Sequence, residues 1–120
     1  MKMVFALLLF VAAPSFAAQV CTDIPATVKA DISNNFDGSI NATNIKLLVD
    51  NEFVSVMAYN GNSAVGICRL LKKTYTIDWQ NKAMAADEKW VHISHDAKLV
   101  SKGQGPVDSE SDVIDSVICR

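Results

Sequence analysis

The sequence predicts an α+β domain in which an N-terminal amphipathic helix packs on a mainly antiparallel sheet of about four to six strands. Between residues 23 and 36, apolar side chains recur every four positions, as on one face of a helix. Several later segments are rich in strand-forming residues and alternate between apolar and polar side chains. An Asn-Gly pair, Asn60-Gly61, lies between two apolar segments and is typical of a β-hairpin.

The chain begins with a segment typical of a cleaved export signal, residues 1–17. One positive charge precedes an unbroken apolar run, and small residues follow at positions 15 and 17. We therefore expect cleavage after Ala17 and one mature domain over residues 18–120, either periplasmic or secreted. The apolar run is shorter than the ~20 residues of a membrane span. A bulky residue precedes Cys21, which disfavours lipid attachment there.

The helix is predicted over residues 23–36, with Pro25 suited to its first turn. Four side chains fall on one face at four-residue spacing: Ile24, Val28, Ile32 and Phe36. The turn residues Asp37-Gly38-Ser39 follow and would end the helix. Such a face normally packs on the domain's own sheet.

The centre of the chain predicts a hairpin around Asn60-Gly61, whose first strand runs over residues 53–59. A two-residue turn places Val54 opposite Ile67 and also brings two residues of opposite charge together. Both faces of the first strand carry apolar side chains. We therefore expect a central strand that is covered on both sides.

The other segments complete the predicted sheet. The segment 82–89 reads as a short helix or a loop, and 101–112 reads as a long polar loop. For the last segment a strand is preferred over a short helix because of its β-branched residues. The remaining strands are predicted at 45–49, 74–79, 90–94 and 113–119.

Three cysteines, Cys21, Cys68 and Cys119, follow the signal, and export permits a disulfide. The odd count leaves a third thiol that is either free or intermolecular. We predict a Cys68–Cys119 bond, because both residues are expected in strands of the same sheet. The rival pairing joins Cys21 to Cys119. No Cys-x-x-Cys pair indicates a redox or zinc site.

The only local cluster of metal-ligand residues is His92, His95 and Asp96. It is a weak candidate, because two histidines three positions apart in a strand point to opposite faces. A cysteine paired with one of these histidines is a further alternative, less favoured than a structural disulfide. The chain has no Gly-x-Ser-x-Gly elbow and no phosphate-binding glycine loop. No catalytic residue and no cofactor are predicted.

Charge narrows the classes of partner. The chain has 11 basic and 13 acidic side chains, and loss of Lys2 with the signal leaves a formal charge of −3. A mildly acidic domain lacks the basic face that binds nucleic acid and the basic stretch that binds anionic lipid. We therefore expect a protein partner in the cell envelope, with no nucleic acid and no membrane span. The sequence does not indicate an oligomeric state.

Three classes of function remain. The favoured one is a small exported, non-enzymatic binding or accessory protein of the inhibitor, immunity or envelope-accessory type, which needs only a stable scaffold and variable loops. The second is a small exported hydrolase or metal-dependent enzyme using His92 and His95. The third is a disulfide-stabilised structural or assembly component. A specific protein partner would favour the first class, whereas a bound metal or a pocket of converging polar groups would favour the second.

Overall fold

The structure, a computed structural model, describes residues 22–23, 27–108 and 111–120. The predicted signal, its cleavage position and Cys21 lie outside these residues. The described elements are β2 (Thr22–Asp23), β3 (Val28–Asn34), β4 (Ile40–Val49), β5 (Glu52–Val56), α1 (Asn62–Leu70), β6 (Thr76–Ala83), β7 (Lys89–Ile93), β8 (Lys98–Gln104) and β9 (Asp112–Cys119).

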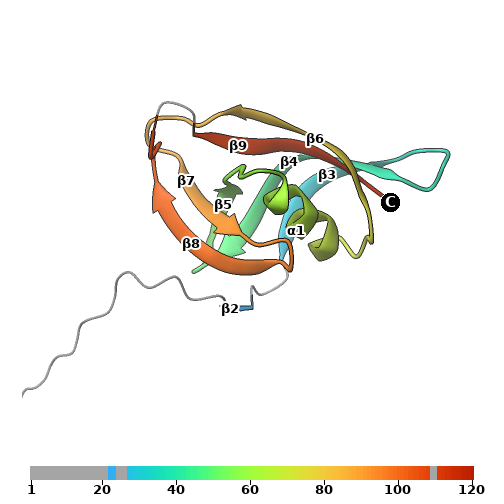
Figure 1. Cartoon of the computed structure of the whole chain (residues 1–120), viewed down its shortest axis with the longest axis horizontal. Helices are drawn as coiled ribbons and strands as arrows, with labels where there is room; N and C mark the ends of the chain where they lie inside the picture. The colour runs from blue at the N-terminus through green and yellow to red at the C-terminus, as the bar shows by residue number, and fades with distance from the viewer. Residues whose placement is uncertain (1–21, 24–26, 109–110) are drawn as a thin grey trace, which may run out of the picture.

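The strands form one mixed sheet that curls around α1 (Figure 1). The strand order is β2-β8-β7-β5-β4-β9-β6, and β3 pairs with β4 beside this path. Among the described strands only β5 and β7 pair in parallel, and the other pairs are antiparallel. The described chain is therefore mostly β, with a single short helix in the middle of the sequence.

The predicted N-terminal helix is wrong, and with it the α+β fold class. Residues 28–34 of that segment form β3, antiparallel to β4. A four-residue spacing is one helical turn but also two strand repeats, so Val28 and Ile32 share a face in either structure. The sheet decides the outcome, because β4 offers a partner along the whole of β3.

The predicted hairpin around Asn60-Gly61 is also wrong. Gly61 instead precedes the first residue of α1, at a backbone φ of 84°. Val54 pairs with Leu47 of β4, and Ile67 is buried on the helix. Ala64, Ile67 and Cys68 are buried at helical spacing, which the strand-based reading overlooked.

Several strand predictions are confirmed. Residues 90–94 and 113–119 correspond to β7 and β9. The start of the predicted central strand is β5, which lies in the middle of the strand order, and its residues Val54, Ser55 and Val56 are all buried. Side chains on both faces of β5 are thus covered, as expected.

Other boundaries differ from the prediction. The strand expected at 74–79 is β6, which extends to Ala83 into the segment read as a helix or loop. The strand β8 occupies the first part of the predicted 101–112 loop. The strand β6 is also less buried than its alternation indicated, since Ile77 and Trp79 remain 46% and 39% exposed.

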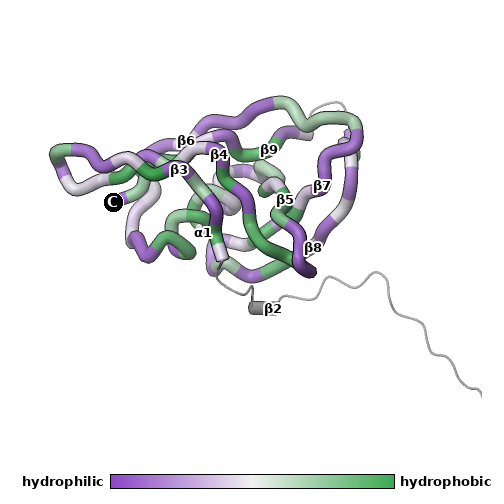
Figure 2. The backbone as a smooth tube through the Cα atoms, turned by 180° about the vertical axis from the view of Figure 1, so that it is seen from behind, coloured by the Kyte–Doolittle hydropathy of each residue, from purple (hydrophilic) through white to green (hydrophobic). Residues whose placement is uncertain are grey.

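The main core lies between α1 and the inner face of the curled sheet. Its most completely buried large side chains come from β4, α1 and β7 and include Leu47, Ile67 and Ile93. In Figure 2 the hydrophobic stretches of β4, β5 and β9 lie toward the middle of the molecule, whereas the loop joining β3 to β4 lies at one end.

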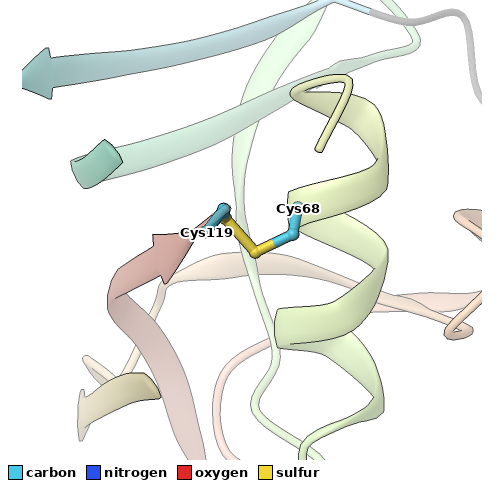
Figure 3. Close-up of a disulfide and its surroundings, with 2 residues drawn as sticks. All are labelled: Cys68 and Cys119. Atoms are coloured by element: carbon cyan, nitrogen blue, oxygen red, sulfur yellow. A yellow bond between two sulfur atoms is a disulfide. The ribbon is translucent and has the colours of Figure 1, made fainter. Parts of the chain in front are cut away.

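Cys68 on α1 and Cys119 on β9 are joined at disulfide distance (Figure 3). The predicted pair is confirmed, although Cys68 reaches its partner from a helix and not from a strand of the same sheet. The bond ties the helix to the sheet that surrounds it. Both cysteines are almost fully buried.

Candidate functional site

The two histidines singled out from the sequence make separate contacts. The ring of His92, half-buried on β7, lies 4.9 Å from the ring of Tyr59, and burial lowers the pKa of His92. His95 Nε2 lies 3.4 Å from Asp96 Oδ1, and both side chains are exposed. Among the described residues no three His, Cys, Asp or Glu side chains gather to hold a metal. Cys68 and Cys119 are bonded to each other, so neither offers a thiol to a histidine.

A partly buried polar cluster that the sequence analysis missed links β4, β5 and the turn before β7. Lys46 Nζ donates a 2.8 Å hydrogen bond to Ser55 Oγ, and Ser55 Oγ in turn donates to Glu88. The other carboxylate oxygen of Glu88 accepts the Ala85 N–H. Burial raises the pKa of Glu88, but these two hydrogen bonds and the Lys46 charge outweigh it and leave the pKa lowered. With Ser55 only 3% exposed, the cluster ties elements together and presents no accessible nucleophile.

An open cleft of about 360 Å³ is lined by residues of β5 and the turn before it, and of β7 and β8. Trp90 and Val54 supply apolar surface, and two ion pairs, Lys89–Glu52 and Lys102–Asp50, lie at its rim. Each lysine faces a carboxylate, so the rim carries balanced charge. The cleft therefore offers no strong field for an ionic ligand.

The feature best suited to binding is the tip of the hairpin between β3 and β4, residues 35–39, which we call the hairpin tip. The hairpin extends beyond the body of the sheet (Figure 1). At its end the side chain of Phe36 is completely exposed, with a relative accessibility of 114%. The next residues, Asp37 and Gly38, make the turn, and Gly38 takes a φ of 87°. A side chain of this size is usually covered by the domain itself.

The hairpin tip is held in one shape by a dense set of hydrogen bonds. The Asn35 and Ser39 backbones are joined by a 2.9 Å bond, and the Asn35 side-chain amide donates to Ser39 Oγ at 2.9 Å. The same amide donates to Asn41 Oδ1 at 3.1 Å. Asp37 Oδ1 accepts from both the N–H and the hydroxyl of Ser39, at 3.0 and 2.6 Å.

The residue that follows β9 also supports the hairpin tip. The Arg120 guanidinium, directly after β9, donates to Asp37 Oδ2 at 3.1 Å. The Ser39 hydroxyl, then its N–H, then Arg120 lower the pKa of Asp37 to about 2. Asp37 is therefore ionised at physiological pH and keeps these bonds, so the turn that carries Phe36 is preorganised.

The sequence analysis identified the turn residues Asp37-Gly38-Ser39 but assigned Phe36 to the buried face of a helix. The available signal was an aromatic residue directly before an Asp-Gly turn, between two segments that each alternate. Because the sequence analysis assigned the residues of β3 to a helix, it did not expect a hairpin at this turn. Phe36 is thus the functional candidate that sequence reasoning missed.

Comparison with known proteins does not assign the chain to a family. No family model matches the chain, and neither a curated protein nor a solved structure matches it significantly. In the described part of the chain, the one helix has nine residues and is far from long enough to cross a bilayer.

Proposed function

We propose that this chain is a small exported binding protein, without catalysis of its own, that inserts Phe36 into an apolar pocket of a protein partner in the cell envelope or outside the cell. The observation that carries the proposal is the complete exposure of an aromatic side chain on a turn fixed by hydrogen bonds. Export rests on the N-terminal signal pattern.

The energetics of the hairpin tip favour binding. Burying a fully exposed phenylalanine is worth about 1.5–3 kcal/mol. Because Asn35, Asp37 and Ser39 already hold the turn, little backbone entropy is lost when a partner closes over Phe36. A rigid aromatic residue that enters a pocket is the usual form of an interface hot spot.

The surroundings of Phe36 indicate a protein pocket in preference to a charged surface. The charge of Asp37 is matched by Arg120, and the neighbours on the β3 side, Asn34 and Asn35, are neutral amides. Anionic lipid and nucleic acid both require clustered basic side chains. A partner's pocket would fit this surface if its floor is apolar and its rim carries groups that hydrogen-bond to amides.

The test compares the exported form of the chain with Phe36→Ala and with Val107→Ala as matched control. Val107 is also an exposed apolar side chain, at 69%, but lies in the loop after β8. Each variant is immobilised, bound envelope proteins are quantified by mass spectrometry, and the Kd of any retained protein is measured by calorimetry. We expect Phe36→Ala to weaken binding about 30-fold, a hot-spot loss of about 2 kcal/mol, and Val107→Ala to leave it unchanged.

Neither substitution should change the denaturant midpoint, because surface side chains contribute within about 0.5 kcal/mol. A partner that binds wild type and Phe36→Ala with equal Kd would contradict the proposal. So would a chain that retains no envelope protein but shows hydrolytic activity abolished by replacing His92 or His95, which would favour the enzyme class.

A further inference from the structure

The second exposed apolar surface of the molecule lies along the edge of the sheet formed by β6. The strand is last in the order and pairs with β9 on one side; on its other side no strand of the described residues pairs with it. Figure 1 shows β6 as the outermost strand of the sheet. Tyr75, Ile77 and Trp79 are 65%, 46% and 39% exposed along this edge. An open edge with apolar side chains is a template for another strand.

The backbone groups that face outward follow from the pairing with β9. The Met84 N–H donates to the Ser111 carbonyl and therefore points inward. The pairing shifts between Gln80 and Asn81, but the extra residue, Asp115, is on β9, so alternation along β6 continues and turns the N–H and C=O of Trp79 and Asn81 outward. The Trp79 N–H agrees, since it is bonded to the side chain of Asp78 at 2.9 Å and not to β9.

We infer that the β6 edge pairs with the β6 edge of a second copy of this chain, antiparallel, with the two-fold axis at Gln80. In this register Trp79 lies opposite Asn81 of the second copy, and both residues have outward N–H and C=O groups that can exchange hydrogen bonds. Such a contact is isologous and closes at two subunits.

Charge complementarity selects this register. With the axis at Gln80, Asp78 of one copy lies opposite Lys82 of the other, twice, on the face that also carries Gln80. Lys82 already lies 3.8 Å from Asp115 of its own chain, so Asp78 of the second copy would join an existing ion pair. A register shifted by one residue either way would break both oppositely charged pairs.

The opposite face of the same segment supplies apolar contact. The two Trp79 rings lie diagonally across the axis, within the reach of aromatic side chains. The ring of Trp79 also packs closely against Gly61. A Cβ added at Gly61 would lie only 3.0 Å from the ring. Because Gly61 restricts the Trp79 ring, the second copy would cover the exposed part of the ring at little cost in side-chain entropy.

The other long free edge, β3, fits a second copy less well. Both edges have a register shift beside the axis that an equivalent register would use, between Lys29 and Asp31 on β3 and between Gln80 and Asn81 on β6, so the shifts do not distinguish them. On β3, Ile32 is the one large apolar side chain that is exposed, at 47%, so this edge offers less apolar surface than Tyr75, Ile77 and Trp79 offer at the β6 edge.

The test uses cysteine cross-linking in a Cys21→Ser background. Residues on the axis face their own copies with Cβ atoms about 4.5–5.5 Å apart, near the range that a disulfide bridges. Gln80→Cys should therefore form a covalent dimer under mild oxidation. Lys82→Cys, which faces residue 78 of the second copy, and Ala30→Cys on β3 are the matched controls and should remain monomeric.

Sedimentation measures the same contact without cross-linking. We expect a concentration-dependent dimer that Asp78→Lys weakens about tenfold, because like charges then oppose each other, and that Asp78→Lys with Lys82→Asp restores. Gln80→Cys cross-linking no faster than Lys82→Cys would overturn the inference, as would a dimer unaffected by the charge reversal. Preferential cross-linking of Ala30→Cys would assign the interface to β3. None of these outcomes depends on binding by Phe36.

Discussion

The chain contains two Asx-Gly turns with the same local chemistry and opposite results. Gly38, after Asp37, has a φ of 87° and closes the β3–β4 hairpin. Gly61, after Asn60, has a φ of 84° and leads into α1. The sequence analysis expected the reverse, a hairpin at Asn60-Gly61 and the end of a helix at Asp37. A turn signal therefore establishes that the chain reverses, but not which elements it joins.

The flanking residues and their surroundings decide between the two. After Gly61 the small buried residues Ser63 and Gly66 let the helix lie against the sheet, where a Cβ on Gly66 would be only 2.4 Å from the Ser94 carbonyl oxygen. Around Gly38 nothing lies within 4 Å of an added Cβ. One turn leads into the helix whose inner face is buried in the core, and the other is left in solvent to present Phe36.

The largest expected effect comes from removing the bond that holds the helix after Gly61. The Cys68–Cys119 bond has a sequence separation of 51 residues, for which the chain-entropy relation gives about 4 kcal/mol. We expect Cys68→Ala with Cys119→Ala to lower the free energy of unfolding by about this amount, measured by urea denaturation. Both cysteines are buried, so lost packing adds to the effect.

The single variants serve as the control for that experiment. If the bond is formed in the protein, Cys68→Ala alone should destabilise nearly as much as the double variant, and reducing agent should shift wild type alone. A wild type insensitive to reductant would show that the two residues pack without a bond.

The next effect compares the two glycines directly. Alanine at a left-handed position costs about 1–2 kcal/mol, so Gly38→Ala should lose about that much. Gly61→Ala should lose more, because its Cβ would also meet the Trp79 ring at 3.0 Å. Urea denaturation of the two variants measures the difference; equal losses would mean that Trp79 moves aside freely.

Much of the strand content could be predicted from the sequence, but the arrangement could not. The strands β7 and β9 were expected, β9 from its β-branched residues, and both faces of β5 were correctly expected to be covered. The four-residue spacing at Val28 and Ile32 fits a helix and a strand equally, so only the pairing with β4 resolves it. Tertiary context overrides local propensity in such segments.

The candidate sites show the same limit. The cysteine pair was predicted correctly among three possible pairings, although the argument for it placed Cys68 in a strand and the structure has it on a helix. It could not find the contact of Arg120 with Asp37, which are 83 positions apart. Nor could it show that Phe36 is exposed, since a residue's burial depends on which element it belongs to.

The smallest expected effect is confined to the exposed turn. The pKa of Asp37 is about 2 in the folded protein, below its usual 3.8. A lowered pKa means that the ionised form is favoured by folding, so this stabilisation is present above about pH 4 and is lost as the pH falls toward 2. Carboxyl NMR chemical shifts of Asp37 across that range should report the low value directly.

Variants of the donors then identify what lowers the pKa of Asp37. The Ser39 hydroxyl is the strongest influence and Arg120 a weaker one. Ser39→Ala should therefore raise the pKa further toward 3.8 than Arg120→Gln does, whereas Phe36→Ala removes no donor and should leave it unchanged. If Arg120→Gln had the larger effect, the long-range ion pair and not the local turn would hold Asp37. The shape of the hairpin tip would then depend on β9, and added salt would loosen it, since exposed ion pairs are screened.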